Sequence, residues 1–158
     1  MKVNLICVGK TEFNHVSEGI EIYRKRMSKY IQFEIIYLRD IKKTKSLSVK
    51  ETKLKEGALI LDKLKKEEIN ILLDEGGKQH SSVEFARYLQ NILVNSSKNI
   101  NFVIGGAYGF SDDVYSFVNN KSISLSKMTF SHQIIRVIFM EQLYRAMSII
   151  NNEPYHHQ

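Results

Sequence analysis

The sequence contains almost no cysteine and no long uninterrupted apolar run. The single cysteine, Cys7, has no second thiol with which to form an internal disulfide, and one thiol cannot build a thiolate zinc cluster. A membrane-spanning helix needs about 20 consecutive apolar residues, and no such run, secretory signal or twin-arginine motif is present. We therefore expect neither export nor membrane insertion, and we expect a cytoplasmic protein.

The common phosphate-binding and metal-binding motifs are missing as well. The first apolar run ends at Gly9 and Lys10 without a G-x-G-x-x-G fingerprint, and no G-x-x-x-x-G-K-[ST] loop occurs. No H-E-x-x-H, paired-histidine or Cys/His spacing indicates a metal, so none is expected. There is no G-x-S-x-G elbow, although a Ser-His-Asp arrangement stays open. These absences disfavour a dinucleotide dehydrogenase and a P-loop enzyme.

The composition is that of one globular domain with a basic surface. A chain of 158 residues with 43% hydrophobic and 25% charged residues fits a single domain over residues 1–158. The net charge is +6, and the excess lies in residues 1–80, where Lys42, Lys43 and Lys45 belong to a basic run. Such a surface favours a polyanion such as RNA, because neutralised phosphates release counterions. A solvated lysine face stays open as the alternative.

Short β-type runs alternate with segments of helical spacing along the chain. Serine followed by glutamate at the third position predicts helices starting near Ser48 and Ser81, a third start falls near Ser111, and the last helix spans Ser131–Asn151. The predicted strands are Val3–Val8, Phe33–Leu38, Ile69–Leu73, Ile100–Ile104 and Ser122–Ser126. This alternation predicts an α/β fold with a mostly parallel sheet of five or six strands and helices on both faces.

Five of the eight glycines fall between Gly76 and Gly109, directly after the third and fourth predicted strands. Parallel sheets bind ligands beyond the carboxyl ends of their strands, so we expect a ligand site at this edge. Glycine lets the backbone approach a ligand closely, and at Gly105 we expect a larger side chain to block the ligand directly. Tight turns without a ligand would explain the same glycines.

The last predicted helix is apolar around its whole circumference, which is typical of a helix buried on all sides. We expect a second copy of the chain to cover part of it, in a homodimer. His132 and Arg136 lie one turn apart and share a side, which suits an anionic, planar substrate beside a glycine-lined pocket. Glu141 and Arg145 lie on roughly the opposite side, where a structural ion pair explains them equally well.

Several motifs together resemble the RlmH family, small bacterial methyltransferases of large-subunit ribosomal RNA within the SPOUT superfamily. The resemblance covers essentially the whole chain, with its motifs in order. They are VNLICVGK (3–10), FVIGGAYG (102–109), SLSKMTFSHQIIRV (124–137), EQLYRA (141–146) and NEPYHH (152–157).

This resemblance implies a SPOUT-type α/β knot, with a deep C-terminal trefoil knot, in a homodimer. It implies S-adenosyl-L-methionine as cofactor and no metal. The implied reaction is methylation at N3 of the pseudouridine in helix 69 of 23S rRNA, with the assembled 70S ribosome as partner. A related knotted methyltransferase acting on another RNA, and a non-catalytic RNA-binding dimer, stay open as alternatives.

The resemblance also assigns site residues. The implied cofactor-binding residues are Leu73, Gly105, Leu125, Ser126, Lys127, Met128, Thr129 and Phe130. His132 is a candidate to accept the N3 proton. The candidates for RNA binding or for completing the site are Arg136, Arg145, Tyr155 and His156. The sequence departs from the family at Glu75, Gly76 and Ser131; Ser131 stands where proline is expected, so we expect a less constrained start of the last helix.

Overall fold

A computed structural model describes residues 1–41 and 47–155. Lys42, Lys43, Lys45 and His156, which the sequence singles out, therefore lie outside the described residues. Within the described part, no helix is both long and apolar enough to cross a membrane.

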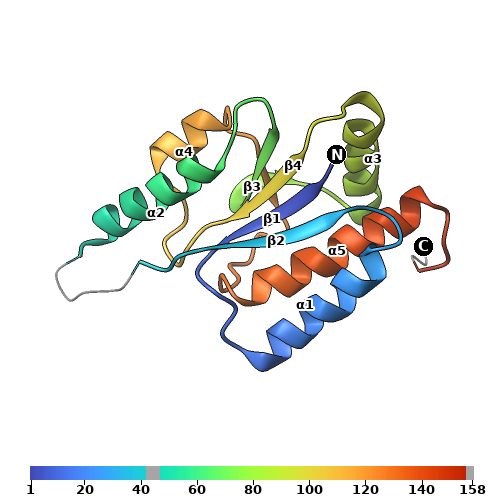
Figure 1. The fold of residues 1–158 in the computed structure, drawn as a ribbon, viewed down its shortest axis with the longest axis horizontal. Coiled ribbons are helices and arrows are strands. Elements are labelled where there is room, and N and C mark those ends of the chain that lie inside the picture. The colour runs from blue at the N-terminus through green and yellow to red at the C-terminus, as the bar shows by residue number, and fades with distance from the viewer. Residues whose placement is uncertain (42–46, 156–158) are drawn as a thin grey trace.

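The described residues form a parallel five-stranded sheet in the order β2-β1-β4-β3-β5 (Figure 1). The strands are β1 Val3–Val8, β2 Phe33–Leu38, β3 Ile69–Gln79, β4 Ile100–Ile104 and β5 Ser122–Ser124. Every residue of β1 and β4 is buried, because these strands lie inside the sheet and are covered on both faces. The predicted strands are confirmed, although β3 is longer and β5 shorter than the sequence predicts.

Helices cover both faces of the sheet (Figure 1). They are α1 Asn14–Met27, α2 Val49–Lys63, α3 Ser82–Asn95, α4 Asp112–Phe117 and α5 Ile134–Ile150. One core cluster joins α1, α3 and α5 to the sheet, and a second joins α2 and α4 to its other face. Along β1, Leu5 and Cys7 enter the first cluster while Ile6 and Val8 enter the second, as the alternation of a strand requires.

The two predicted capping boxes are confirmed. The Ser48 hydroxyl accepts from the Glu51 backbone N–H, and the Glu51 carboxylate accepts from the Ser48 N–H at 2.8 Å. Ser81 and Glu84 repeat this arrangement at the start of α3. Each box satisfies backbone N–H groups that the first turn of a helix leaves without partners, which fixes where α2 and α3 begin.

The last helix differs from the sequence prediction in two respects. It begins at Ile134, so His132 belongs to a turn before the helix and not to its first turn. Its apolar circumference is covered mostly within the chain, since α1 and α3 flank it and the sheet lies above it. The chain itself therefore covers more of α5 than the sequence suggests, and the homodimer stays a prediction. The trefoil knot stays a prediction.

Three asparagines form a ladder across neighbouring strands near their amino ends. Asn4, Asn101 and Asn70 lie in register on β1, β4 and β3. Their side-chain amides are joined by hydrogen bonds of 2.8 Å, and the Glu68 carboxylate accepts from Asn101 at 2.8 Å. These buried amides are satisfied only in one alignment of the three strands, so the ladder fixes the register of the sheet.

A bulge in β3 shapes the opposite end of the sheet. Leu73 and Lys78 both pair with Ile123 of β5, so residues 74–77 leave the ladder between them. A Cβ built on Gly77 would lie 2.7 Å from the backbone of Ser122 and Ile123, whereas a Cβ on Gly76 would meet only the Asp74 carboxylate, at 3.3 Å. Gly77 therefore allows β5 to run close to the bulge.

This difference between adjacent glycines gives a matched test. Gly77→Ala should lower the free energy of unfolding by about 1–3 kcal/mol, because backbone atoms cannot move aside as a side chain can. Gly76→Ala should change it by less than about 0.5 kcal/mol. Denaturant unfolding of both variants measures the difference, and equal values would contradict the close approach of β5.

Candidate active site

A cavity of about 750 Å³ opens at the carboxyl ends of β3, β4 and β5, the edge where the sequence places a ligand site. Three segments that are distant in the sequence enclose it: the bulge of β3, the glycine turn after β4, and the loop between β5 and α5. Apolar side chains line its inner part, among them Leu73, Ile104 and Leu125. The cavity is large enough for a ligand of a few hundred daltons.

Most of the residues assigned by resemblance to the cofactor do line this cavity. They are Leu73, Gly105, Leu125, Ser126, Met128, Thr129 and Phe130. Lys127 does not line it. Glu75 and Gly76, where the sequence departs from the family pattern, line it as well.

The turn after β4 requires glycine because its residues pack closely against one another. Gly109 has a φ of 76°, which favours glycine, and it bridges back to Gly106. A Cβ on Gly105 would lie 3.2 Å from the Gly109 carbonyl oxygen and from the Phe110 ring. A larger residue at 105 would thus press on the turn as well, and the expectation that it blocks the ligand stays a prediction.

The bulge of β3 supplies two carboxylates to the cavity. Tyr115 donates a hydrogen bond to Asp74 Oδ2 at 2.9 Å, and Thr129 donates to Glu75 Oε2 at 2.5 Å. Burial, together with the bond to Asp74, raises the pKa of Tyr115 above its ordinary value, so the phenol keeps its proton and remains a donor. The Glu75–Thr129 hydrogen bond joins the bulge of β3 to the loop between β5 and α5, which are two of the three segments that enclose the cavity. Carboxylates on this wall favour a ligand that carries positive charge.

The loop between β5 and α5 is held by its own hydrogen bonds. Ser124 donates to the Ser126 carbonyl at 2.8 Å, and the Ser126 hydroxyl accepts from the Met128 N–H at 2.9 Å. The Ser131 hydroxyl accepts from the Ile134 N–H at 3.2 Å, at the first residue of α5. Serine at this position thus contributes one hydrogen bond at the start of α5, and the effect of serine in place of proline stays a prediction.

His132 lines the cavity, but Arg136 does not. The Arg136 side chain is fully buried, and its guanidinium donates to the Val8 carbonyl at 2.8 Å, the His132 carbonyl at 2.9 Å and the Thr11 hydroxyl at 3.0 Å. The Gln133 amide donates to the Lys10 carbonyl and accepts from the Glu12 N–H. A guanidinium without exposed surface cannot contact RNA, so that expectation for Arg136 is wrong.

We call this arrangement the β1–α5 clamp: Gln133 and Arg136 bound to residues 8–12. The clamp holds the turn that carries His132 against the end of β1. Sequence reasoning missed Gln133, because its two partners are more than a hundred residues away along the chain.

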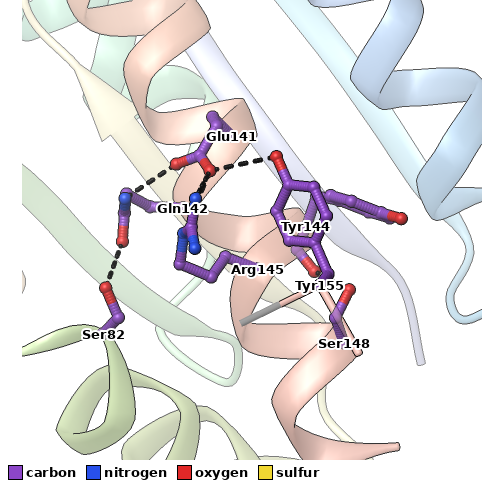
Figure 2. A network of polar contacts seen from close by, with 7 residues as sticks. All are labelled: Ser82, Glu141, Gln142, Tyr144, Arg145, Ser148 and Tyr155. Atoms are coloured by element: carbon purple, nitrogen blue, oxygen red, sulfur yellow. Dashed lines mark hydrogen bonds and ion pairs between the residues drawn. The ribbon is translucent and has the colours of Figure 1, made fainter. Parts of the chain in front are cut away.

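Arg145 and Tyr155 belong to a separate polar network on the second half of α5 (Figure 2). The Glu141 carboxylate accepts from Arg145 Nε at 3.0 Å, from the Tyr155 hydroxyl at 3.3 Å and from Gln142, which in turn accepts from Ser82 of α3. Burial is the main cause that raises the pKa of Tyr155 to about 12. None of these side chains lines the cavity of the same chain. Within residues 1–41 and 47–155, no group of His, Cys, Asp and Glu side chains could hold a metal.

Comparison with known proteins identifies the family to which this chain belongs. A family model described as "Predicted SPOUT methyltransferase" matches residues 1–156, and the chain belongs to this family of methyltransferases, which use S-adenosylmethionine as methyl donor. Relatives from Parabacteroides distasonis (51% identical) and Christiangramia forsetii (49%) match over 100% of both chains, and both are named ribosomal RNA large subunit methyltransferase H.

A solved structure supports the fold independently. The tRNA (m1G37) methyltransferase from Aquifex aeolicus aligns with a TM-score of 0.53 at 14% identity, over 100% of this chain and 76% of that one. At this identity the likeness concerns the fold alone.

The cavity fits S-adenosylmethionine by its volume and by the chemistry of its lining. The Gly105–Gly109 turn exposes backbone to the cavity, and Leu73, Ile104 and Leu125 offer apolar walls for an adenine ring. Asp74 and Glu75 supply negative charge on the wall formed by the bulge. That charge complements a ligand with a sulfonium and an ammonium group.

The β1–α5 clamp predicts that one buried arginine stabilises the whole fold. Arg136→Ala should lower the free energy of unfolding by about 3 kcal/mol, because it leaves a cavity and buried acceptors without donors. Arg24→Ala removes an exposed ion pair with Glu21 on α1 and should cost less than about 1 kcal/mol. Urea denaturation of the two variants tests the clamp, and a small loss for Arg136→Ala would contradict it.

Proposed function

We propose that residues 1–158 form a single catalytic domain that transfers a methyl group from S-adenosylmethionine to large-subunit ribosomal RNA. The observation that carries this proposal is the identity of about half of all residues, over the full length, with relatives named for that activity. The finer proposal is that the target is N3 of the pseudouridine in helix 69 of 23S rRNA, in the assembled 70S ribosome. Action on the ribosome places the protein in the cytoplasm.

The residues that line the cavity support this chemistry. S-adenosylmethionine, when bound, supplies an electrophilic methyl group. Leu73, the Gly105 turn and the backbone of residues 125–130 would hold the cofactor, while Asp74 and Glu75 balance its positive charge. Methyl transfer depends on alignment of donor and acceptor, so the protein contributes chiefly by fixing these walls relative to one another. The Glu75–Thr129 hydrogen bond joins two of them.

We propose that His132 accepts the proton that leaves N3 of the target. It lines the cavity beside the loop that would hold the cofactor, and its backbone carbonyl is bound by Arg136. A neutral imidazole is a suitable base at neutral pH. Arg136 therefore acts through the position of His132 and not by contact with substrate.

We also propose that the protein is a homodimer. Ile134, Ile138 and Ile149 share one side of α5 and are only partly buried in the single chain although they are apolar. Packing of two such helices would cover them. Arg145 and Tyr155 do not reach the cavity of their own chain, and we propose that these two residues, together with His156, complete the site of the partner.

A methylation assay tests the catalytic proposal. Ribosomes from cells that lack this modification should be methylated by the wild-type chain, and mapping should locate the product at N3 of the helix 69 pseudouridine. His132→Ala should lower the methylation rate at least about 100-fold, as expected for loss of a general base, with unchanged cofactor affinity in calorimetry. A product on another RNA would favour a different knotted methyltransferase, and absence of cofactor binding would favour a non-catalytic RNA-binding dimer.

The dimer has a test of its own. Ile138→Glu should abolish both dimerisation and methylation, since a buried unpaired carboxylate costs several kcal/mol in each half of a two-fold interface. Val94→Glu, at an exposed position of α3, is the control and should change neither. Analytical ultracentrifugation gives the mass, and a fully active monomeric variant would contradict a shared site.

A further inference from the structure

Two large apolar side chains remain exposed on the loop that lines the cavity. Met128 is 76% exposed and Phe130 is 40% exposed, and both contribute to the cavity wall. Tyr108, on the glycine turn across the cavity, is 42% exposed and lines it as well. Single exposed apolar side chains are common on protein surfaces. Several of them at one cavity indicate a binding surface.

The backbone that carries these side chains is held in place. The Met128 N–H is bound by Ser126, and Thr129, between Met128 and Phe130, is bound to Glu75. The loop is thus fixed by hydrogen bonds on both sides of Met128 while the two apolar side chains stay outside the core. A fixed backbone that presents apolar groups loses little conformational entropy when a ligand covers them.

Resting on the proposed function, the position of this surface identifies its occupant. The methyl acceptor must share the cavity with the methyl donor, because the two atoms react in line at short range. A base within an RNA helix or a stacked loop reaches such a cavity only when it is turned out of its stack. Aromatic and apolar side chains then replace the stacking that the base has lost.

We propose that Met128, Phe130 and Tyr108 form the platform on which the extruded target base stacks during methyl transfer. The backbone of residues 125–130 faces the cofactor, whereas these side chains face the base. Lys53 of α2 lines the same cavity and supplies a cation for a flanking phosphate. The platform thus separates recognition of RNA from recognition of cofactor within one loop.

The experiment compares Phe130→Ala and Met128→Ala with Phe130→Tyr, which keeps an aromatic ring. The control is Phe13→Ala, because Phe13 is 50% exposed before α1 and does not line the cavity. Methylation of 70S ribosomes at saturating S-adenosylmethionine gives kcat/KM for the RNA, and calorimetry gives cofactor affinity. The alanine variants should lose about tenfold or more in kcat/KM, as for removal of one stacked base, with cofactor affinity within about twofold of wild type. Phe130→Tyr should recover most of the kcat/KM that Phe130→Ala loses, because it keeps the ring, and Phe13→Ala should match wild type.

Three results would overturn the platform. Alanine variants as active as wild type would show that no base stacks there. A parallel loss of cofactor affinity would assign the side chains to the cofactor pocket, and a loss of dimer mass in sedimentation would assign them to contact with a second copy. Failure of the proposed function is recognised separately, because the wild-type chain itself would then leave ribosomes unmethylated.

Discussion

The fully buried guanidinium of Arg136 joins the end of β1 to the start of α5. Arg136 donates to the carbonyls of Val8 and His132 and to the hydroxyl of Thr11, and its guanidinium carbon lies 5.9 Å from the centre of the Tyr37 ring. The ion pairs found in residues 1–41 and 47–155 do not include it. A delocalised cation tolerates neutral acceptors better than an ammonium would. The end of β1, the turn that carries His132 and the start of α5 are thus all fixed by Arg136.

The cavity follows from how the strands end. The β3 bulge moves Asp74 and Glu75 out of the ladder, and the close approach of β5 keeps the next loop beside them. One hydrogen bond between Glu75 and Thr129 then joins the two walls. The fold therefore presents backbone and carboxylates together at one edge, which suits a cationic cofactor that needs no metal or phosphate-binding motif.

The features that sequence predicted best are local ones. Capping boxes at Ser48 and Ser81 depend on residues three positions apart, so their pattern is readable directly. The bulge in β3 and the partners of Gln133 depend on contacts between distant segments, which periodicity does not encode. The same limit explains α5: its apolar circumference was visible, but the sequence did not show that α1 and α3 cover it. The cavity residues came mostly from family resemblance and not from spacing.

The position of α5 has a consequence for how the chain is made. This helix is synthesised after α1 and α3, yet it covers apolar faces of both and binds residues at the end of β1 and just after it. During translation, the apolar faces of α1 and α3 are exposed to solvent until α5 has been made. Exposed apolar faces are prone to incorrect association. Contacts that span most of the chain also make folding slow, since long loops must close before their contacts form. The protein therefore reaches its native state only after its C-terminal helix has left the ribosome that made it.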